Sequence, residues 1–515
     1  MKIVKYLFFI SAVAATGCNK IIDINPQSNL NTATFYANAS DVSAALTGCY
    51  NGMQKPLNDE WTLTELRSDN AIQGAPGSLS TPNILLNELD QFMPSSSHSG
   101  IYNYWINTYF NIRNTNMVLN SLGVNYTAAT GKITYDQIKI SVPDASRKLM
   151  AAQASFIRAH HYFNLVRLYG GVFLSHEPLS PAEAKEMNRT SVDEIYKLII
   201  ADLQNASDNG DKAKSGAIAA ANIGRANSWA AKALLAKVYL TLNRKAEAAT
   251  LLTDVIANSG YKLQANYADV FSITNEMNSE VLFAIRYKAG GIGLGSSLGN
   301  AFAPLNSGAA VINGSGSGLN YPAMELNNQY NAADKRKVVN IGTYGTGAAA
   351  KIYPAKHISP VVVANDSETD WMVIRYSDVL LMLAEANGYS QASLDLINQT
   401  RVRAGLSLLT LTTVANATAF ETALSNERKF EFAFENQRWF DLLRFGSTMP
   451  SVKVMDIIKA HFAVMYPLHY MAYPTPKLSL LDMQNLVTSN KMILPIPQRE
   501  IDNNTGLVIQ QNPGY

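Results

Sequence analysis

The feature that most constrains the fold of this chain is a series of amphipathic helical segments. Between residues 151 and 169, apolar side chains recur at alternating spacings of four and three, which places them on one face of a helix. They are Ala152, Phe156, Ala159, Phe163 and Val166. Gly170 and Gly171 follow, and glycine is typical of the end of a helix. Because such a face must be buried against other elements, the sequence predicts a mainly α-helical protein.

Two short helices rich in small residues indicate a repeat scaffold. Residues 231–242 and 248–255 each present one apolar face, and a polar turn at residues 243–245 separates them. Two helices joined by a tight turn resemble a tetratricopeptide repeat. No regular period runs through the chain, so we expect degenerate repeats. A further helix is predicted from the capping pattern at residues 190–194 through Leu203.

The middle of the chain differs from the helical stretches on either side. Val281 to Tyr287 is predicted to be a strand, and residues 290–318 are dominated by Gly, Ser, Ala and Asn. Because this composition buries little apolar surface, we expect a long surface loop, either ligand-binding or merely flexible. Helices are predicted again at residues 376–389, 391–404 and 419–445. The predicted organisation is a leader (1–17), an N-terminal helical repeat region (18–260), a loop-rich insertion with a few short strands (261–370) and a C-terminal region (371–515), packed as one unit.

The N-terminus predicts export and lipid attachment. Lys2 and Lys5 precede a short apolar run, which is followed by small residues and Cys18. This is the layout of a bacterial secretory signal with a lipobox, and the run is too short to span a bilayer. We expect the leader to be cleaved and Cys18 to be acylated, which would hold the protein on a membrane. An ordinary signal peptide with a chance cysteine is the alternative.

Charge and cysteine content argue against several classes of function. Without Lys2 and Lys5, 40 of the 42 Lys and Arg residues remain, against 40 Asp and Glu residues, so there is no electrostatic footprint for nucleic acid. Once Cys18 is acylated, Cys49 has no disulfide partner, and a zinc site of several thiolates is excluded. His160 and His161 are neighbours whose side chains would point roughly 100° apart on a helix, so both cannot bind one metal ion. We predict no transition-metal site and no cofactor, and calcium binding stays open.

Seven separated segments together resemble the SusD/RagB family of surface nutrient-binding lipoproteins. The most specific is Glu427 to Arg444, with the sequence ERKFEFAFENQRWFDLLR. The others are residues 154–172, 230–240, 374–386, 398–405, 495–501 and 511–515. They occur in the order of the family across nearly the whole chain.

The resemblance implies a SusD-like helical scaffold with long irregular ligand-binding loops, lipid-anchored on the outer face of the outer membrane. There the protein would bind a nutrient oligo- or polysaccharide, without cleaving it, and deliver it to a SusC-like TonB-dependent transporter. A peptide- or protein-binding lipoprotein that serves a similar transporter is the alternative, because tetratricopeptide-like scaffolds commonly bind peptides.

A surface glycoside hydrolase is a weaker alternative. Glu427, Glu431 and Glu435 are spaced by four, and a pair of carboxylates is what glycoside cleavage requires. However, Arg428, Arg438 and Arg444 alternate with acidic residues in the same segment, which is typical of a helix with ion pairs along its surface. We therefore expect these carboxylates to be structural.

Candidate ligand-binding residues follow from the chemistry of sugars. A pyranose stacks its C–H face on an aromatic ring, while Asp, Asn and Arg side chains bind its hydroxyls. The segment with Trp61, Arg67, Asp69 and Asn70 resembles one that lines the ligand side in the family, although Arg67 and Asp69 could equally form a structural pair. The remaining candidates lie in or after a Ser-rich loop or flank the glycine-rich loop: His98, Tyr102, Tyr104, Tyr287 and Tyr321. Each could instead belong to the core, as we expect for Trp229 and Trp439.

Overall fold

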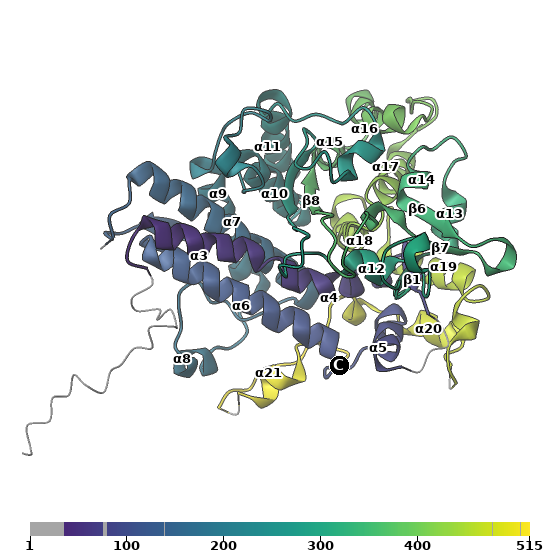
Figure 1. Cartoon of the computed structure of the whole chain (residues 1–515), viewed down its shortest axis with the longest axis horizontal. Coiled ribbons are helices and arrows are strands. Elements are labelled where there is room, and N and C mark those ends of the chain that lie inside the picture. Colours follow the sequence, from purple (N-terminus) through teal and green to yellow (C-terminus); the bar gives the residue numbers. More distant parts are fainter. Residues whose placement is uncertain (1–35, 76–79, 139, 476, 505) are drawn as a thin grey trace, which may run out of the picture.

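The computed structural model describes residues 36–75, 80–138, 140–475, 477–504 and 506–515. The predicted leader and Cys18 lie outside these residues. Helices dominate the described part, and its strands form four two-stranded sheets (Figure 1). This confirms the predicted fold class. No helix among the described residues is both long enough and apolar enough to cross a bilayer.

The N-terminal helices pack around α7 (Asp144–Tyr169), which begins earlier than predicted and ends where predicted. Gly170 closes it with a φ of 71°. Almost every side chain from Ala151 to Tyr169 is buried, so this helix is buried all round rather than on one face. The reason is that other helices surround it: α3 (Ala39–Asn51), α4 (Gln54–Thr64), α6 (Ser99–Ser121), α9 (Val192–Asn209) and α10 (Ser228–Thr241).

Two other predicted helical features are confirmed. The Ser191 hydroxyl caps α9 by accepting a hydrogen bond from the Glu194 N–H, and α9 continues six residues beyond Leu203. Helices α10 and α11 (Lys245–Asn258) form the predicted pair, and Asn243 makes the turn between them with a φ of 57°. Asparagine tolerates this left-handed conformation better than most residues.

The strands join segments that are far apart in the sequence. β1 (Ala71–Gln73) pairs with β5 (Asn320–Pro322), and β4 (Val281–Ile285) pairs with β8 (Trp371–Arg375). The other two sheets are β2 (Val124–Thr127) with β3 (Lys132–Tyr135), and β6 (Ile341–Tyr344) with β7 (Lys351–Pro354). All four pairs are antiparallel.

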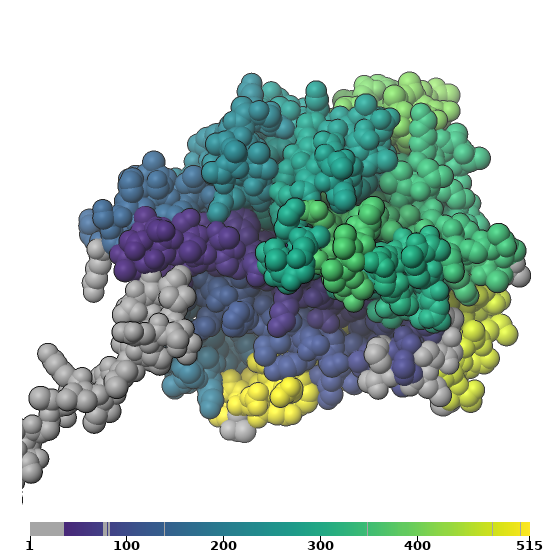
Figure 2. All heavy atoms as spheres, in the orientation of Figure 1, coloured from purple at the N-terminus to yellow at the C-terminus, as the bar shows by residue number. Residues whose placement is uncertain are grey.

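The glycine-rich segment at residues 290–318 is more ordered than an irregular surface loop. It contains α12 (Leu298–Phe302), and Leu298, Phe302 and Ile312 are buried. The Asp366 carboxylate accepts hydrogen bonds from the N–H groups of Gly290 and Gly291, both at 2.8 Å. These contacts hold the segment against the rest of the protein. In the space-filling view, teal-green atoms from this part of the sequence lie on the face turned towards the viewer (Figure 2).

The remaining helices complete the structure. They are α5 (Thr81–Asp90), α8 (Pro181–Lys185), α13 (Met324–Gln329), α14 (Lys337–Asn340), α15 (Tyr376–Asn387), α16 (Gln391–Ala404), α17 (Ala417–Glu431), α18 (Arg438–Thr448), α19 (Val454–Met465), α20 (Leu480–Leu486) and α21 (Gln498–Asp502). The predicted bounds of α16 match the structure. The regional boundaries at residues 260 and 370 stay predictions.

The predicted continuous helix over residues 419–445 is wrong, because the chain breaks between α17 and α18. Phe434 and Asn436 take φ values of 65° and 57° there. The peptide groups of the break have partners from elsewhere in the chain. The Asn436 N–H donates to Glu65 Oε1 at 2.6 Å, and Lys356 Nζ donates to the Ala433 carbonyl at 2.9 Å. These bonds replace those that a continuous helix would make.

Asp441 pairs along α18 with Arg444 at 2.8 Å, as expected, but Glu427, Glu431 and Glu435 pair across the fold instead of along one helix. Arg336 contacts Glu427 at 2.6 Å and Glu431 at 3.1 Å. Arg375 contacts Glu431 at 3.0 Å and Glu435 at 2.9 Å. All three carboxylates are buried. The structural role expected for them therefore holds, but their partners come from segments that lie far away in the sequence.

We predict that breaking this network costs much more than breaking a surface pair. Glu431→Ala removes the carboxylate shared by Arg336, Arg375 and Arg403, so the free energy of unfolding should fall by about 3–5 kcal/mol. Lys148→Ala removes an exposed pair with Asp144 and should change it by less than about 1 kcal/mol. Urea unfolding measures both values, and similar losses in the two variants would contradict the prediction.

Candidate functional site

Four of the predicted ligand-binding residues lie in the core, and Trp61 and Tyr104 are the most deeply buried of them; the others are Tyr287 and Tyr321. The Trp61 ring meets Phe302 edge to face, with ring centroids 5.1 Å apart, and only 3% of Trp61 is exposed. Tyr104 is fully buried, and its hydroxyl donates to Glu60 Oε2 at 3.4 Å. Neither ring offers a face to a ligand in this structure.

Arg67, Asp69 and Asn70 lie together after α4, but Arg67 and Asp69 do not pair. The Arg67 guanidinium lies over the Trp439 ring, 4.3 Å from its centroid. Asp69 accepts hydrogen bonds from Arg438 at 2.7 and 3.0 Å and pairs with Lys429 at 2.8 Å. Burial raises the pKa of Asp69, but the two cations outweigh it and hold this pKa well below its usual value.

The other predicted residues pack against neighbouring segments of the chain, and the contacts of Tyr287 and Asn70 given below are made by their main-chain groups. His98 caps α6, and Tyr102 is half-buried beneath the Arg499 guanidinium. Tyr321 accepts a hydrogen bond from the Leu305 N–H at 3.3 Å, and the Tyr287 N–H donates to Asp370 at 2.9 Å. Asn70 is buried, and its carbonyl accepts a hydrogen bond from the Ala323 N–H at 2.9 Å.

No Trp or Tyr side chain of the described residues forms an exposed platform. Among their aromatic side chains, Phe110 alone is exposed, at 62%. Eight of the nine predicted ligand-binding residues are buried and Tyr102 is half-buried, so their contact with a ligand stays a prediction.

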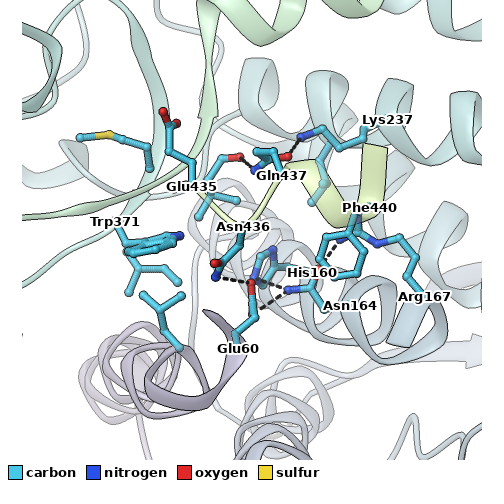
Figure 3. Close-up of a pocket in the computed structure, with 15 residues that line it drawn as sticks. Glu60, His160, Asn164, Arg167, Lys237, Trp371, Glu435, Asn436, Gln437 and Phe440 are labelled. Carbon is cyan, nitrogen blue, oxygen red and sulfur yellow. Dashed lines mark hydrogen bonds between the residues drawn. The ribbon is translucent and has the colours of Figure 1, made fainter. Parts of the chain in front are cut away.

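A small cavity with both polar and apolar lining residues lies where the N-terminal helices meet the turn between α17 and α18 (Figure 3). Its volume is about 30 Å³, which leaves room for a water molecule but not for a sugar ring. The Glu60 carboxylate accepts hydrogen bonds from Asn164 at 3.1 Å and from Asn436 at 3.2 Å. Burial raises the pKa of Glu60. The cavity is therefore an internal polar junction between the two halves of the chain.

A wide cleft between α13, α17 and α19, here called the α17–α19 cleft, has the size of a ligand site. Its volume is about 630 Å³, within the usual range for small-molecule sites. The lining residues are mostly polar and surround one half-buried ring: Asp69, Glu325, Gln329, Thr422, Ser425, Asn426, Lys429, Phe430, Arg438, Ser451, Val452, Lys453, Asp456, Ile457 and Ala460.

The floor of this cleft is an internally paired set of charges. Asp69, Lys429 and Arg438 form the ion pairs described above, and Lys429 also donates to Gln329 Oε1 at 2.9 Å. Glu325 Oε2 lies 3.0 Å from His461 Nδ1. Burial raises the pKa of Glu325, but its hydrogen bond to His461 and the nearby charges lower it overall. The floor is thus polar and preformed.

The rim of the cleft carries polar groups that are free to bind a ligand. Thr422, Asn426 and Phe430 are spaced by four on one face of α17. Asn426, Lys453 and Asp456 are exposed, and their side chains make no hydrogen bond or ion pair within the described residues. Our sequence analysis missed these three residues. For Asn426 the available signal was a polar position on a predicted helix, which is also typical of ordinary solvent exposure, whereas Lys453 and Asp456 lie beyond the predicted helices.

A smaller hollow of about 330 Å³ lies beside Tyr287. Its polar side chains are already engaged, since Gln54 donates to the Arg286 carbonyl at 2.7 Å and Arg225 donates to Gln153 at 3.2 Å. Arg286 pairs with Asp370. The α17–α19 cleft is therefore the better candidate site, because it combines a larger volume with unengaged polar groups.

Two family models of known proteins together match most of the chain. One family model, described as the SusD family, matches residues 299–515, and a second, described as starch-binding associating with outer membrane, matches residues 20–240. The SusD-like protein P2 of Formosa agariphila is 26% identical over 442 residues, covering 79% of this chain and 82% of the relative. A SusD-like protein of Bacteroides ovatus is 26% identical over 291 residues, covering 54% of this chain and 48% of the relative.

Solved structures share the fold. A laminarin-binding SusD-like protein superposes with a TM-score of 0.73 at 24% identity, covering 93% of this chain and 100% of the other. Surface glycan-binding protein A from Bacteroides thetaiotaomicron, in complex with laminarihexaose, superposes with a TM-score of 0.70 at 20% identity, covering 92% and 99%. At these identities the likeness concerns the fold.

We predict that Trp61→Ala lowers the stability of the fold, because the Trp61 ring packs in the core. Removing this buried ring should lower the free energy of unfolding by about 3–5 kcal/mol, whereas Trp61→Phe should retain much of the packing. Urea unfolding of both variants measures this. A Trp61→Ala protein as stable as the original chain would contradict the core position.

A pH effect should arise at Glu65, which accepts the Asn436 N–H at the helix break. Burial raises the pKa of Glu65 from 4.5 to about 8. Between these values the folded state retains a proton that the unfolded state has released, so stability falls as the pH rises. Glu65→Gln keeps an acceptor without titrating. Between pH 5 and 8 the unfolding free energy of this variant should fall less steeply than that of the original chain, with a slope that is smaller by up to about 1.4 kcal/mol per pH unit. Parallel pH profiles of the two proteins, measured by urea unfolding, would exclude this role.

Proposed function

The chain belongs to the SusD-like family, and from this premise we propose that it captures a nutrient glycan at the cell surface and delivers it to a SusC-like TonB-dependent transporter. The two structural neighbours that bind laminarin or laminarihexaose support a glycan as the ligand class. Acylation at Cys18 would hold the protein at the outer membrane, with its body facing the exterior. The family name that refers to association with the outer membrane supports this location.

We assign glycan capture to the α17–α19 cleft. The observation that carries this assignment is the set of unengaged polar groups at its rim, Asn426, Lys453 and Asp456. A sugar hydroxyl both donates and accepts hydrogen bonds, and these side chains provide an amide, an ammonium and a carboxylate. Phe430 and Ile457 add apolar surface for the C–H groups of a sugar. In the described floor, Asp69 is paired with Lys429 and Arg438, and Glu325 with His461, so the floor does not require a charged ligand.

Binding in this cleft would be weak enough for handover. An open, hydrated site of this kind fits dissociation constants from micromolar to millimolar, or about −8 to −4 kcal/mol. A weakly held glycan can leave for the transporter, whereas a tightly held one would remain on the lipoprotein.

The charges of the cleft support binding rather than bond cleavage. Glycoside hydrolysis needs one carboxylic acid whose pKa is raised, so that it can donate a proton. Asp69 and Glu325 both have lowered pKa values, because cations or His461 contact them. Glu427, Glu431 and Glu435 are buried in ion pairs and do not reach a substrate.

Affinity gel electrophoresis with a panel of polysaccharides, laminarin and starch among them, tests the proposal. The soluble chain from Asn19 onward should be retarded by at least one of them. Asn426→Ala and Asp456→Ala should weaken this binding about tenfold or more, which corresponds to about 1.4 kcal/mol. Asn120→Ala is the matched control, since Asn120 is exposed on α6 and lies outside the cleft.

The possible results separate the ligand from its site. If no polysaccharide retards the chain, glycan capture is wrong and a peptide becomes the leading candidate. If binding persists in both cleft variants, the glycan site lies elsewhere. Co-purification of the lipid-anchored protein with a TonB-dependent transporter tests the delivery step.

A further inference from the structure

A second pocket, with a different chemical character, lies between α6, α8 and α21. Its volume is about 480 Å³. Three aromatic rings form its floor: Trp105 lies 4.9 Å from Tyr109 and 5.6 Å from Phe173, measured between ring centroids. Aliphatic and thioether side chains line its walls, namely Ile106, Ile112, Leu179 and Met187. The proposed glycan capture does not use this pocket.

The rim of this pocket carries charges of both signs. Arg113 and Lys185 provide two cations, and Glu177 and Glu500 provide two anions. None of the four side chains forms an ion pair within the described residues. A ligand that carries both an ammonium and a carboxylate would therefore find an unpaired opposite charge for each.

An exposed apolar strip extends from the pocket along α6. Ile106 is 43% exposed and Phe110 is 62% exposed, and the two residues are spaced by four on the helix. Exposed apolar surface next to a well-formed pocket is typical of a binding site, because water leaves it when a ligand covers it.

The floor is better suited to an apolar side chain than to a sugar. Trp105 is only 2% exposed, so the half-buried rings of Tyr109 and Phe173, which pack against it, are the part of the floor that a ligand can reach. The Tyr109 hydroxyl already donates to the Phe173 carbonyl at 2.7 Å, so this donor is not available to a sugar. A buried ring cluster with a charged rim instead matches an apolar group that carries polar ends.

We propose that this pocket is a binding site for a short peptide, with an aromatic or branched aliphatic side chain against the Tyr109 and Phe173 rings. The ammonium of the peptide would lie towards Glu177 or Glu500, and its carboxylate towards Arg113 or Lys185. This inference does not rest on glycan capture, because the two sites share no lining residue.

The tripeptides Gly-Phe-Gly and Gly-Gly-Gly are suitable probes, and binding is measured by calorimetry and by tryptophan fluorescence. Gly-Phe-Gly should bind with saturation and change the fluorescence, because Trp105 packs against the two rings that the phenylalanine side chain would cover. Gly-Gly-Gly, which has no side chain for the floor, should bind at least tenfold more weakly. A Gly-Phe-Gly peptide with acetylated and amidated ends should also bind more weakly, because it lacks both terminal charges.

A pocket-filling variant locates the site without removing core side chains. Ala184 is exposed on α8 and lines the pocket, so Ala184→Phe should weaken Gly-Phe-Gly binding at least tenfold. Ala182→Phe is the matched control, since Ala182 is exposed on the same helix and does not line the pocket.

Three results would overturn the proposal. The first is that Gly-Phe-Gly and Gly-Gly-Gly bind equally or not at all. The second is that Ala184→Phe leaves Gly-Phe-Gly binding unchanged. The third is that a polysaccharide retained by the chain loses its binding in Ala184→Phe, which would assign the pocket to a glycan. Polysaccharide binding that persists in Ala184→Phe, together with a loss of peptide binding, supports two separate sites.

Discussion

A set of buried ion pairs around the break between α17 and α18 holds the two halves of this protein together. Arg375, at the end of β8, reaches Glu431 and Glu435, while Arg438, at the start of α18, reaches Asp69 in the N-terminal half. Removing these charges from water is costly, and only well-placed partners repay the cost. The network therefore acts mainly by selecting one arrangement of segments. Any other packing would leave buried charges without partners.

The candidate glycan site follows directly from this arrangement. The pairing of Asp69 with Lys429 and Arg438 connects α17, α18 and the segment after α4, and the same three residues form the floor of the α17–α19 cleft. Because the floor is already paired, only the rim residues remain available to a ligand. A floor whose charges are already paired, with a few free groups above it, suits modest affinity for a neutral molecule, which is what the proposed capture and handover require.

The two proposed sites differ in how the fold distributes its aromatic residues. Within the described part of the chain every ring except that of Phe110 is buried or half-buried, including those that the sequence analysis proposed for sugar stacking. In the α17–α19 cleft a single half-buried ring accompanies many polar groups. Between α6, α8 and α21 three rings form an apolar floor beneath charges of both signs. The first arrangement matches hydroxyl-rich ligands, whereas the second matches an apolar side chain with charged ends.

The sequence by itself determined the helical class, the family and several helix bounds. The end of α7 at Gly170, the start of α9 at Ser191 and both ends of α16 could be read locally, because periodicity and capping depend on neighbouring residues. The tertiary structure alone decided that α17 and α18 separate, that Trp61 and Tyr321 are buried, and that Asn426 and Asp456 stay free. These outcomes depend on partners far away in the chain, such as Glu65 for the Asn436 N–H and Phe302 for Trp61. A local pattern shows that a side chain is polar or aromatic, but only the packed fold determines which partner it meets or whether water still reaches it.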